Sequence, residues 1–568
     1  MLKKFDKFAV FLAALFVVSF VCLYWLFPGS VIYQEMFQMF LWDKSYFFSM
    51  IDVPGGLASY ITEFIVQFYY YPVCGAALVS IILVWVAWLT LRISRLFYDG
   101  VEPNILHTVP SLVLLGALGD PDLTHSILVA VVACLFLSWA GIRLLIRNTM
   151  PCRLAVLAIF PVAYFLIGPA VYIVLILLSA YIIKHRMGIV YVLGSALLLL
   201  LTILVCSRVF MYPVERFFYG IEYYRYHQCE PLVLIAIFAS GISPIIHIPE
   251  SVSRFKFFGY IQLALLLGFF YLACSHYPKY QHDTIYNLKK LQQGKFADVI
   301  EYYTDNFPVR HLQVQLLNGA LAHEGRLLSE MFTHPQPDLE TLLPETFNDM
   351  FTPLIMAETF FNMGLNLHAM HYYFESRTGD PTYRPSAMVT LRLAECHLID
   401  NNSALATKYL LPLRKTLFYK GKANEYMEYL LQGRMSEHPF IAEKKQNTLK
   451  KNGIQALSTA NVLPLLRNLM EVNPKNRMAY EYLMGVHLLS GDMEGVVEDI
   501  SLAGQLQYTE LPRHLQESLA LYWYKTHNES MKGVPNVVSD YYVNQINMGV
   551  VPNDSFWHYY LKHQVSKK

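Results

Sequence analysis

The sequence has little charge, and the charge that it has is balanced. Charged residues make up 15% of the 568 positions, against roughly 25% in an ordinary globular domain. Lys and Arg together number 44 and Asp and Glu number 43, so the net charge is +1. A chain without a basic surplus lacks the electrostatic footprint of a nucleic-acid-binding protein, and we expect no nucleic-acid partner.

Several motifs that mark soluble enzymes are also missing. The sequence contains no P-loop, no Rossmann glycine fingerprint and no serine-nucleophile elbow, which argues against soluble-nucleotide chemistry. There is no CxxC pair, and most of the 8 cysteines lie inside apolar runs, where cysteine behaves as a small hydrophobe. We therefore expect neither a disulfide framework nor a zinc site.

Hydrophobic residues are abundant, at 55% of the chain, and the mean hydropathy is +0.34. The excess lies before about residue 275, in runs near the length of about 20 residues that a helix needs to cross a bilayer. The first run follows Lys3, Lys4 and Lys7 and is too long for a signal peptide, so we expect a retained anchor. We predict about nine spans, at 8–27, 73–92, 104–118, 125–142, 154–167, 169–184, 189–211, 231–248 and 257–275.

The loop charges predict the orientation. A turn at Gly168-Pro169 places Lys184 and Arg186 on the same side as the N-terminal lysines and the later pair Arg254 and Lys256. The opposite loops are acidic with few cations, so every short loop then obeys the positive-inside rule. We predict a cytoplasmic N-terminus and an extracytoplasmic C-terminal half, periplasmic if the membrane is a bacterial inner membrane.

The second half, 276–568, has ordinary polarity and a repeated pattern of paired amphipathic helices. Alanine, aromatic residues and glycine recur at helical spacing around 293–303, 357–373, 393–409 and 479–494. The pattern resembles tetratricopeptide repeats, which use small residues where paired helices pack closely. The expected fold class is therefore all-α: a polytopic helical bundle, 1–275, followed by a soluble, tetratricopeptide-like helical-repeat domain.

The predicted external loops carry the residues that point to chemistry. Loop one, 28–72, is long, and its stretches Val31–Trp42 and Leu57–Tyr71 are amphipathic, as in helices that lie in the membrane interface. Loop two, 119–125, holds Asp120-Pro121-Asp122. Loop four, about 212–230, is rich in aromatic and charged side chains.

This layout resembles the GT-C superfamily of membrane glycosyltransferases, above all its oligosaccharyltransferase branch. In that superfamily an acidic residue stands early in a large first external loop, and a D-x-D or D-x-E motif follows in the second. The resemblance implies that Glu35, Asp120 and Asp122 are catalytic acids and ligands of a divalent metal, Mg or Mn. It also implies substrate-binding roles for residues of loop four: Arg216, Glu222, Arg225 and His227.

The sequence departs from this family in two respects. Gln34-Glu35 stands where an aspartate is usual, and the second half lacks a W-W-D-type acceptor motif, which argues against asparagine-linked glycosylation. The same residues also have simpler interpretations. Asp120-Pro121-Asp122 suits a tight turn, Glu35 can face water, and Arg216 and Arg225 can anchor the chain to lipid headgroups.

Three functional hypotheses follow. The first is a GT-C transferase that moves a sugar or oligosaccharide from a polyprenyl-(pyro)phosphate carrier to a protein or glycan acceptor outside the membrane. The second is a non-catalytic membrane-anchored scaffold whose helical repeats bind protein partners during envelope assembly. The third, a transporter or flippase, is disfavoured because the charges cluster at the ends of the spans and no inverted repeat is evident.

Overall fold

The computed structural model describes most of the chain: residues 7–99, 101, 103–247, 260, 264, 267–268, 271, 278–344, 349–379, 384–449, 462–506, 508–527, 529–533 and 535–566. Within these residues the chain is all-helical and forms no strand, as the sequence predicts. It divides into two compact units. Unit 1 ends at His282 and also takes in Arg384–Ala387 and Lys415–Phe418, while unit 2 comprises Asp283–Tyr383, Met388–Arg414 and Tyr419–Lys568.

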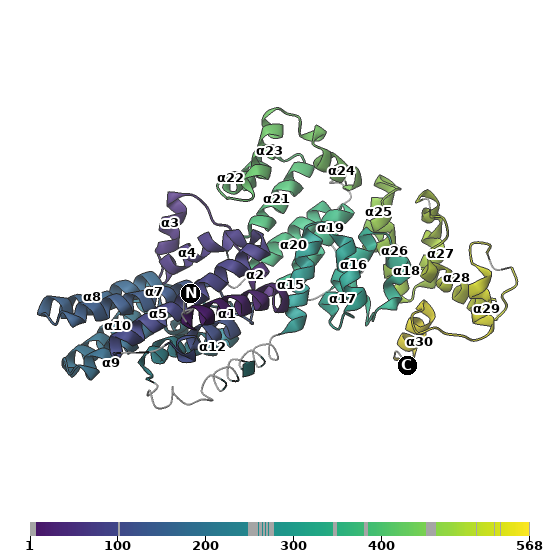
Figure 1. Ribbon diagram of the computed structural model, residues 1–568. Coiled ribbons are helices and arrows are strands. Elements are labelled where there is room, and N and C mark those ends of the chain that lie inside the picture. The colour runs from purple at the N-terminus through teal and green to yellow at the C-terminus, as the bar shows by residue number, and fades with distance from the viewer. Residues whose placement is uncertain are drawn as a thin grey trace, which may run out of the picture. The chain divides into compact units, whose positions relative to one another are not determined.

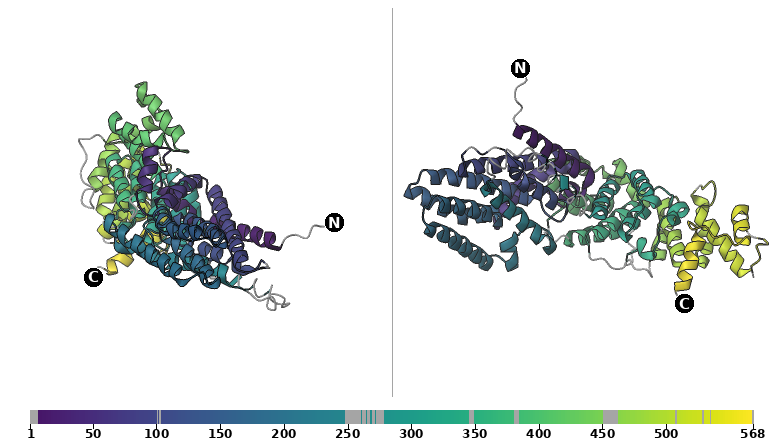
Figure 2. Two further views of the ribbon diagram at one scale, coloured as in Figure 1. Left: turned by 90° about the vertical axis from the view of Figure 1, so that its left-hand side faces the viewer. Right: turned by 60° about the horizontal axis from the view of Figure 1, so that its bottom comes forward.

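Unit 1 is a bundle of apolar helices, coloured purple to teal in Figures 1 and 2, with shorter helices in loops one and four. Its elements are α1 Lys7–Val21, η1 Cys22–Leu26, α2 Gly29–Met36, α3 Lys44–Ile51, α4 Gly56–Val66, η2 Gln67–Tyr70, α5 Pro72–Phe97, η3 Ile105–His107, α6 Val109–Ala117, α7 Ser126–Ile146, α8 Met150–Ile167, η4 Pro169–Val171, α9 Tyr172–Lys184, α10 Ile189–Val209, α11 Val214–Tyr219, η5 His227–Cys229, α12 Glu230–Ile242 and η6 Ser243–Ile245.

Six helical stretches in the described part of the chain are long and apolar enough to cross a membrane: Phe8–Leu26, Pro72–Phe97, Ser126–Ile146, Met150–Ile167, Ile189–Val209 and His227–Ile245. The predicted span at 169–184 is a shorter apolar helix, and that at 104–118 contains only the 9-residue α6. The span predicted at 257–275, with Arg254 and Lys256 before it, lies outside the continuously described residues. The total of nine spans therefore stays a prediction.

The outward faces of the bundle are apolar, as expected for helices surrounded by lipid. Along α10 the side chains of Leu193, Leu197 and Val205 are 63%, 57% and 61% exposed. A helix that is apolar all round is stable only in a protein core or in lipid. Between helices, Gly141 and Gly241 permit close packing, because an added Cβ would lie 3.0 and 2.9 Å from side chains of α9.

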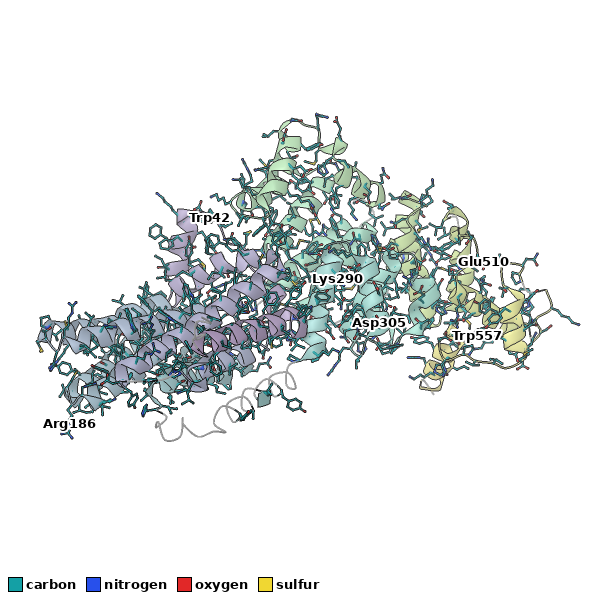
Figure 3. All side chains as sticks on the ribbon, viewed as in Figure 1. Trp42, Arg186, Lys290, Asp305, Glu510 and Trp557 are labelled. Atoms are coloured by element: carbon teal, nitrogen blue, oxygen red, sulfur yellow. The ribbon has the colours of Figure 1, made fainter. Side chains whose placement is uncertain are left out.

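The hairpin predicted at Gly168-Pro169 is present. Helix α8 ends at Ile167, and Gly168 adopts a φ of +97° before η4 and α9 begin, a backbone conformation that glycine adopts readily. Arg186, in the turn between α9 and α10, lies at the end of the bundle away from α2 (Figure 3).

Loop one differs from the prediction. Its first amphipathic stretch, Val31–Trp42, is helical only as far as Met36, and every residue of α2 is buried, so this helix cannot lie with one face in the membrane interface. An additional short helix, α3, precedes the break at Gly55. The second stretch is helical, as α4 and η2.

Unit 2 is a set of paired helices, coloured from teal to yellow in Figure 1. Its elements are most of α15 Lys279–Gln292, then α16 Phe296–Asp305, α17 His311–His323, α18 Leu327–Glu330, η7 Met331–Thr333, η8 Leu339–Thr341, α19 Phe351–Met363, α20 Asn366–Thr378, α21 Ala387–Ile399, α22 Ser403–Leu413, α23 Lys420–Leu431, η9 Met435–Glu437, α24 Pro439–Asn447, α25 Val462–Val472, α26 Arg477–Ser490, α27 Met493–Asp499, η11 Ile500–Gln505, α28 Arg513–Thr526, α29 Asp540–Asn547 and α30 Phe556–Ser566.

Helix pairs occur at the positions where the sequence predicts them. Gly294, Gly364 and Gly491 end helices in the left-handed conformation, with φ of +73°, +102° and +72°, as is common at helix C-termini. Tetratricopeptide character itself stays a prediction.

Buried ion pairs connect the helices of unit 2. Arg392 of α21 donates to Glu358 of α19 at 3.1 Å and to Glu395 at 2.8 Å, and both carboxylates are fully buried. Further along, the buried Glu517 of α28 accepts from His514 Nδ1 and from the backbone N–H of Phe556, at 2.9 and 2.8 Å, and so fixes the start of α30.

Candidate functional site

The acidic motif of loop two forms a tight turn directly after α6. The Asp120 carboxylate accepts a hydrogen bond from the backbone N–H of Asp122 at 3.0 Å, which is the Asx-turn geometry that aspartate favours. The turn interpretation is thus correct for the backbone. The turn is closed by the Asp120 side chain, so this interpretation does not account for the side chain of Asp122.

Loop four pairs with loop two in a fixed register. Leu123 and Tyr224 form an isolated antiparallel bridge, and the backbone N–H of Arg225 donates to the carbonyl of Asp122 at 2.9 Å. This pairing brings the side chains of Asp122 and Arg225, which are 103 positions apart by their numbers in the sequence, to the same place.

Helix α2, at the start of loop one, packs on the same turn. The side-chain amide of Gln34 donates to the carbonyls of Pro121 and Leu123, both at 3.1 Å. The neighbouring Tyr33 makes a side-chain hydrogen bond to Asp122. Loops one, two and four therefore converge at Asp122.

The Asp122 carboxyl is held in an environment that disfavours its charge. It is 4% exposed, and its Oδ1 accepts no hydrogen bond from the described residues. Burial, followed by the neighbouring Asp120 carboxylate, raises the pKa of Asp122 to about 6, against the opposing effect of Arg225. The Arg225 guanidinium stacks over the Tyr33 ring at 4.2 Å.

His125, next to this turn, is a neutral structural residue. Its two ring nitrogens lie 3.3 Å from Ser30 Oγ and 3.0 Å from Tyr69 Oη. Burial, with a smaller effect of Arg225, lowers the pKa of His125 to about 3. The histidine therefore joins loop one to the start of α7 by hydrogen bonds between uncharged groups.

A second polar group in unit 1 is a buried ion triad. Arg384 donates through its two terminal nitrogens to Glu63 of α4 and to Glu222 of loop four. The hydroxyls of Thr124 and Ser126 donate to the backbone carbonyl of Glu222. The triad thus touches loop two as well. Burial raises the pKa of the Glu63 carboxyl, against the opposing effect of Arg384 and a smaller one of Arg225, which therefore lies near it.

Two of the predicted substrate-binding residues lie apart from this cluster. Arg216 uses its guanidinium to hold loop four together, by donating to three backbone carbonyls of that loop, those of Ile221, Tyr224 and Arg225. His227 is largely exposed and pairs with Glu230 at 2.7 Å. Glu222 and Arg225 belong to the cluster, although Glu222 is engaged by Arg384.

Glu35 is buried on α2, at 2% exposure. The described part of the chain contains no group of three or more His, Cys, Asp and Glu side chains placed to hold a metal ion. Asp120 and Asp122 lie in one turn, but among the described residues they belong to no such group of three. The described residues thus do not form a ligand set for a bound ion, and the Mg or Mn site stays a prediction.

Sequence reasoning missed Glu63 and Arg384 as members of the site. In the sequence, Glu63 is one of several acidic residues in the predicted external loops and nothing distinguishes it from the others. Arg384 lies in the half predicted to be a repeat domain. No local pattern marks either residue, because their pairing is made by the tertiary structure.

Unit 1 also contains an apolar groove of about 320 Å³. Helices α4, α7 and α8 form it, and every residue that lines it is hydrophobic: Leu57, Ala58, Ile61, Val129, Ala133, Phe136, Leu137, Ile159, Val162, Ala163, Leu166 and Ile167. The groove shares α4 with Glu63, and the Tyr223 hydroxyl of loop four donates to the carbonyl of Ile167, one of its lining residues.

One protein-family model matches the chain, over residues 3–547, and it describes a family of unknown function, DUF6057. No curated protein and no solved structure gives a significant match.

Proposed function

We propose that this chain, which belongs to the DUF6057 family of unknown function, is a membrane glycosyltransferase of GT-C type. It transfers a sugar or oligosaccharide from a polyprenyl-(pyro)phosphate carrier to an acceptor on the extracytoplasmic side. The observation that carries this proposal is the convergence of loops one, two and four on the buried Asp122, with Arg225 beside it.

Asp122 is suited to act as a general base. With a pKa of about 6, its carboxyl is mostly ionised at neutral pH and still basic enough to accept a proton. The acceptor hydroxyl would give that proton to Asp122 as its oxygen bonds to the anomeric carbon of the donor sugar. The bond from that carbon to the carrier phosphate oxygen breaks, and the phosphate leaves with the electron pair.

Arg225 and the apolar groove supply the remaining requirements. A guanidinium matches phosphate oxygens well, so Arg225 would bind the carrier phosphate. The groove between α4, α7 and α8 would hold the first part of the polyprenyl chain, because all its lining residues are apolar. Glu35, buried on the helix that contacts the turn, keeps its proposed role as a second acid.

Substrate access requires a small rearrangement at Asp122. Gln281 lies over the carboxyl, with its Nε2 3.4 Å from Oδ2. A contact of that length is weak, so its displacement by an acceptor costs little.

Under this proposal the acidic loops face the periplasm of a bacterial inner membrane. The Arg186 end of the bundle then lies on the cytoplasmic side, as the positive-inside rule requires. Arg186→Cys and His227→Cys, each made in a variant that lacks the native cysteines, test this assignment. A membrane-impermeant maleimide applied to intact cells should label His227→Cys and leave Arg186→Cys unlabelled.

The decisive experiment is a transfer assay with the full chain in lipid nanodiscs. Undecaprenyl phosphate carrying a radiolabelled hexose serves as the donor probe, and release of the hexose to water or to added oligosaccharide acceptors is measured. Asp122→Asn should lower the rate by about 10²–10⁴-fold, and Arg225→Met should raise the donor concentration needed for half-maximal rate. Glu437→Gln and Arg434→Met, the two members of an exposed ion pair, are matched controls. Full activity of Asp122→Asn would refute the assignment of the base.

A scaffold function is the second candidate, and one observation favours it. Unit 2 contains a groove of about 810 Å³ beside Glu510, between α27, α28 and the segment that leads to α29 (Figure 3). Gln516 fixes its walls, by donating to the carbonyl of Leu511 at 2.6 Å and accepting from the N–H of Ser539 at 2.8 Å. If the chain is a scaffold, a groove variant such as Val537→Glu, at a side chain that is 55% exposed, should abolish its cellular function, and Asp122→Asn should preserve it.

A further inference from the structure

Residues 384–387, which the sequence places in the helical-repeat half, are a structural part of unit 1. Arg384 pairs with Glu63 and Glu222. The hydroxyl of Ser386 donates to the carbonyl of Met36 at the end of α2, and the N–H of Ala387 donates to the carbonyl of Gln38 at 3.0 Å. We name residues 384–387 the first strap.

Residues 415–418, here the second strap, belong to unit 1 as well. The carbonyl of Lys415 accepts from the N–H of Trp42 at 3.0 Å, and the Lys415 ammonium pairs with Asp43. The ring of Phe418 stacks on Tyr70, with centroids 5.0 Å apart and planes within 3°. Both straps therefore hold loop one.

The charges of the triad make Arg384 the critical residue of the first strap. The side chains of Glu63, Glu222 and Arg384 are 6%, 16% and 19% exposed. A carboxylate buried to this extent is costly unless it is paired and hydrogen-bonded. Without Arg384, two like charges would face each other with little water to screen them.

Glu222 in turn fixes the register of loop four. Its carbonyl accepts from Thr124 and Ser126 of loop two. Three residues along, the N–H of Arg225 donates to the carbonyl of Asp122. A displacement of Glu222 would therefore disturb the pairing that brings Arg225 and Asp122 together.

We infer that Arg384 is a positioning residue through which the C-terminal half of the chain holds the polar cluster of unit 1 in its assembled geometry. The first strap is joined directly to the C-terminal half through helix α21. Helix α21 begins at Ala387, the last residue of the first strap, and continues in unit 2 to Arg392 and Glu395, which are fixed there by buried ion pairs. The inference goes beyond the proposed activity and does not depend on it.

Cys229 offers a test that does not need a substrate. Its thiol is buried and lies 3.6 Å from the Asp120 carboxylate, at the junction of loops two and four. Maleimide labelling of the purified full chain, with the labelled cysteines identified by mass spectrometry, reports whether this junction opens. The exposed Cys74 is the internal positive control and the buried Cys134 the negative control.

Three variants separate charge from packing. In Arg384→Met the labelling rate of Cys229 should rise at least tenfold, while Cys134 stays protected. The triple variant Glu63→Gln, Glu222→Gln, Arg384→Met removes both unpaired carboxylates and should restore protection. Arg434→Met, which breaks an exposed ion pair, should leave Cys229 protected.

The effect of pH gives a second readout that a loss of packing alone would not produce. In Arg384→Met, the labelling rate of Cys229, divided by the rate for the unfolded chain at the same pH, should be lower at pH 5 than at pH 8, because protonation removes the two unpaired charges. The other ionisable groups that face the triad are Tyr46, Tyr212 and Arg225. Burial raises the pKa of Tyr46 and of Tyr212, so neither tyrosine ionises between pH 5 and pH 8.

If Arg384→Met protects Cys229 as well as the wild type does, the inference is wrong. It is also wrong if the triple variant labels as fast as Arg384→Met, because the defect is then not one of charge. Should Arg384→Met fail to fold, a folded and protected triple variant would support the inference and a misfolded one would overturn it.

Discussion

Asp122 should make the protein less stable at neutral pH than at acidic pH. Burial, with Asp120 nearby, raises the pKa of its carboxyl from 3.8 to about 6. An acid with a raised pKa binds its proton more tightly in the folded state than in the unfolded state. Its contribution to stability is therefore greatest below the unfolded pKa and is lost as the pH rises from about 4 to about 6.

The size of the effect follows from the shift. A difference of about two pKa units, at 1.36 kcal/mol each, corresponds to ~3 kcal/mol of folding free energy lost by pH 7. Asp122→Asn keeps the shape and the carbonyl acceptor but cannot ionise, so it should recover most of this energy above pH 6 and none below pH 4.

The measurement is the melting temperature of the full chain in detergent between pH 4.5 and pH 8, for the wild type and Asp122→Asn. The advantage of the variant should grow from about a third of its full size at pH 4.5 to several degrees at pH 8, since ~1 kcal/mol corresponds to roughly 2–4 °C in a domain of 150–250 residues. Asp43→Asn is a control in which the effect on stability should be reversed. Hydrogen bonds from Lys415 and Ser45 lower the pKa of Asp43, so its ionised form stabilises the fold and the variant should melt below the wild type as the pH rises.

A variant that is less stable than the wild type at pH 8 would refute this reasoning. That result would mean that the ionised Asp122 carboxylate stabilises the fold through its pairing with Arg225. Burial would then not be the dominant effect on the pKa of Asp122. The general-base role would then lose its support as well, because the pKa would lie well below neutrality.

Three further predictions concern structural residues, and each is checked by thermal unfolding or limited proteolysis. Tyr69→Phe should lower stability by about 1–3 kcal/mol, because it leaves the buried Nδ1 of His125 without its partner. Gly168→Ala should cost roughly 1–3 kcal/mol, since alanine is strained at a φ of +97°, whereas Gly194→Ala in mid-helix, where the added Cβ stays 3.8 Å from its neighbour, should be neutral or stabilising. Glu517→Gln should release α30 to proteolysis at lower protease concentration, because the carboxylate that fixes the start of this helix is lost.

Much of the membrane unit could be predicted because its determinants are local. A run of apolar residues such as 189–211 specifies a helix and its solvent at once, and α10 is observed at Ile189–Val209. The break at Gly168 follows equally from local chemistry, since a glycine before a proline both permits and forces the turn.

The errors arose where tertiary packing overrides a local pattern. Val31–Trp42 has the alternation of an interfacial helix, but α2 is buried on all sides and ends at Met36, because it packs against the loop-two turn. The Asp122 site was predicted only in part, since a motif can place two carboxylates in a turn but cannot show which atoms are left without partners.

The proposed orientation accounts for the pairing of the acidic external loops with Arg384 of the first strap. The positive-inside rule depletes cations from short external loops, so Glu63 and Glu222 can find few partners near their own positions in the chain. A long domain crosses the membrane largely regardless of its charge, so it can carry a cation to that side. Arg384 lies 321 residues beyond Glu63 and supplies such a charge. The extracytoplasmic half would then have a structural reason to share one chain with the bundle: it brings the counter-ion that the short loops are not free to provide.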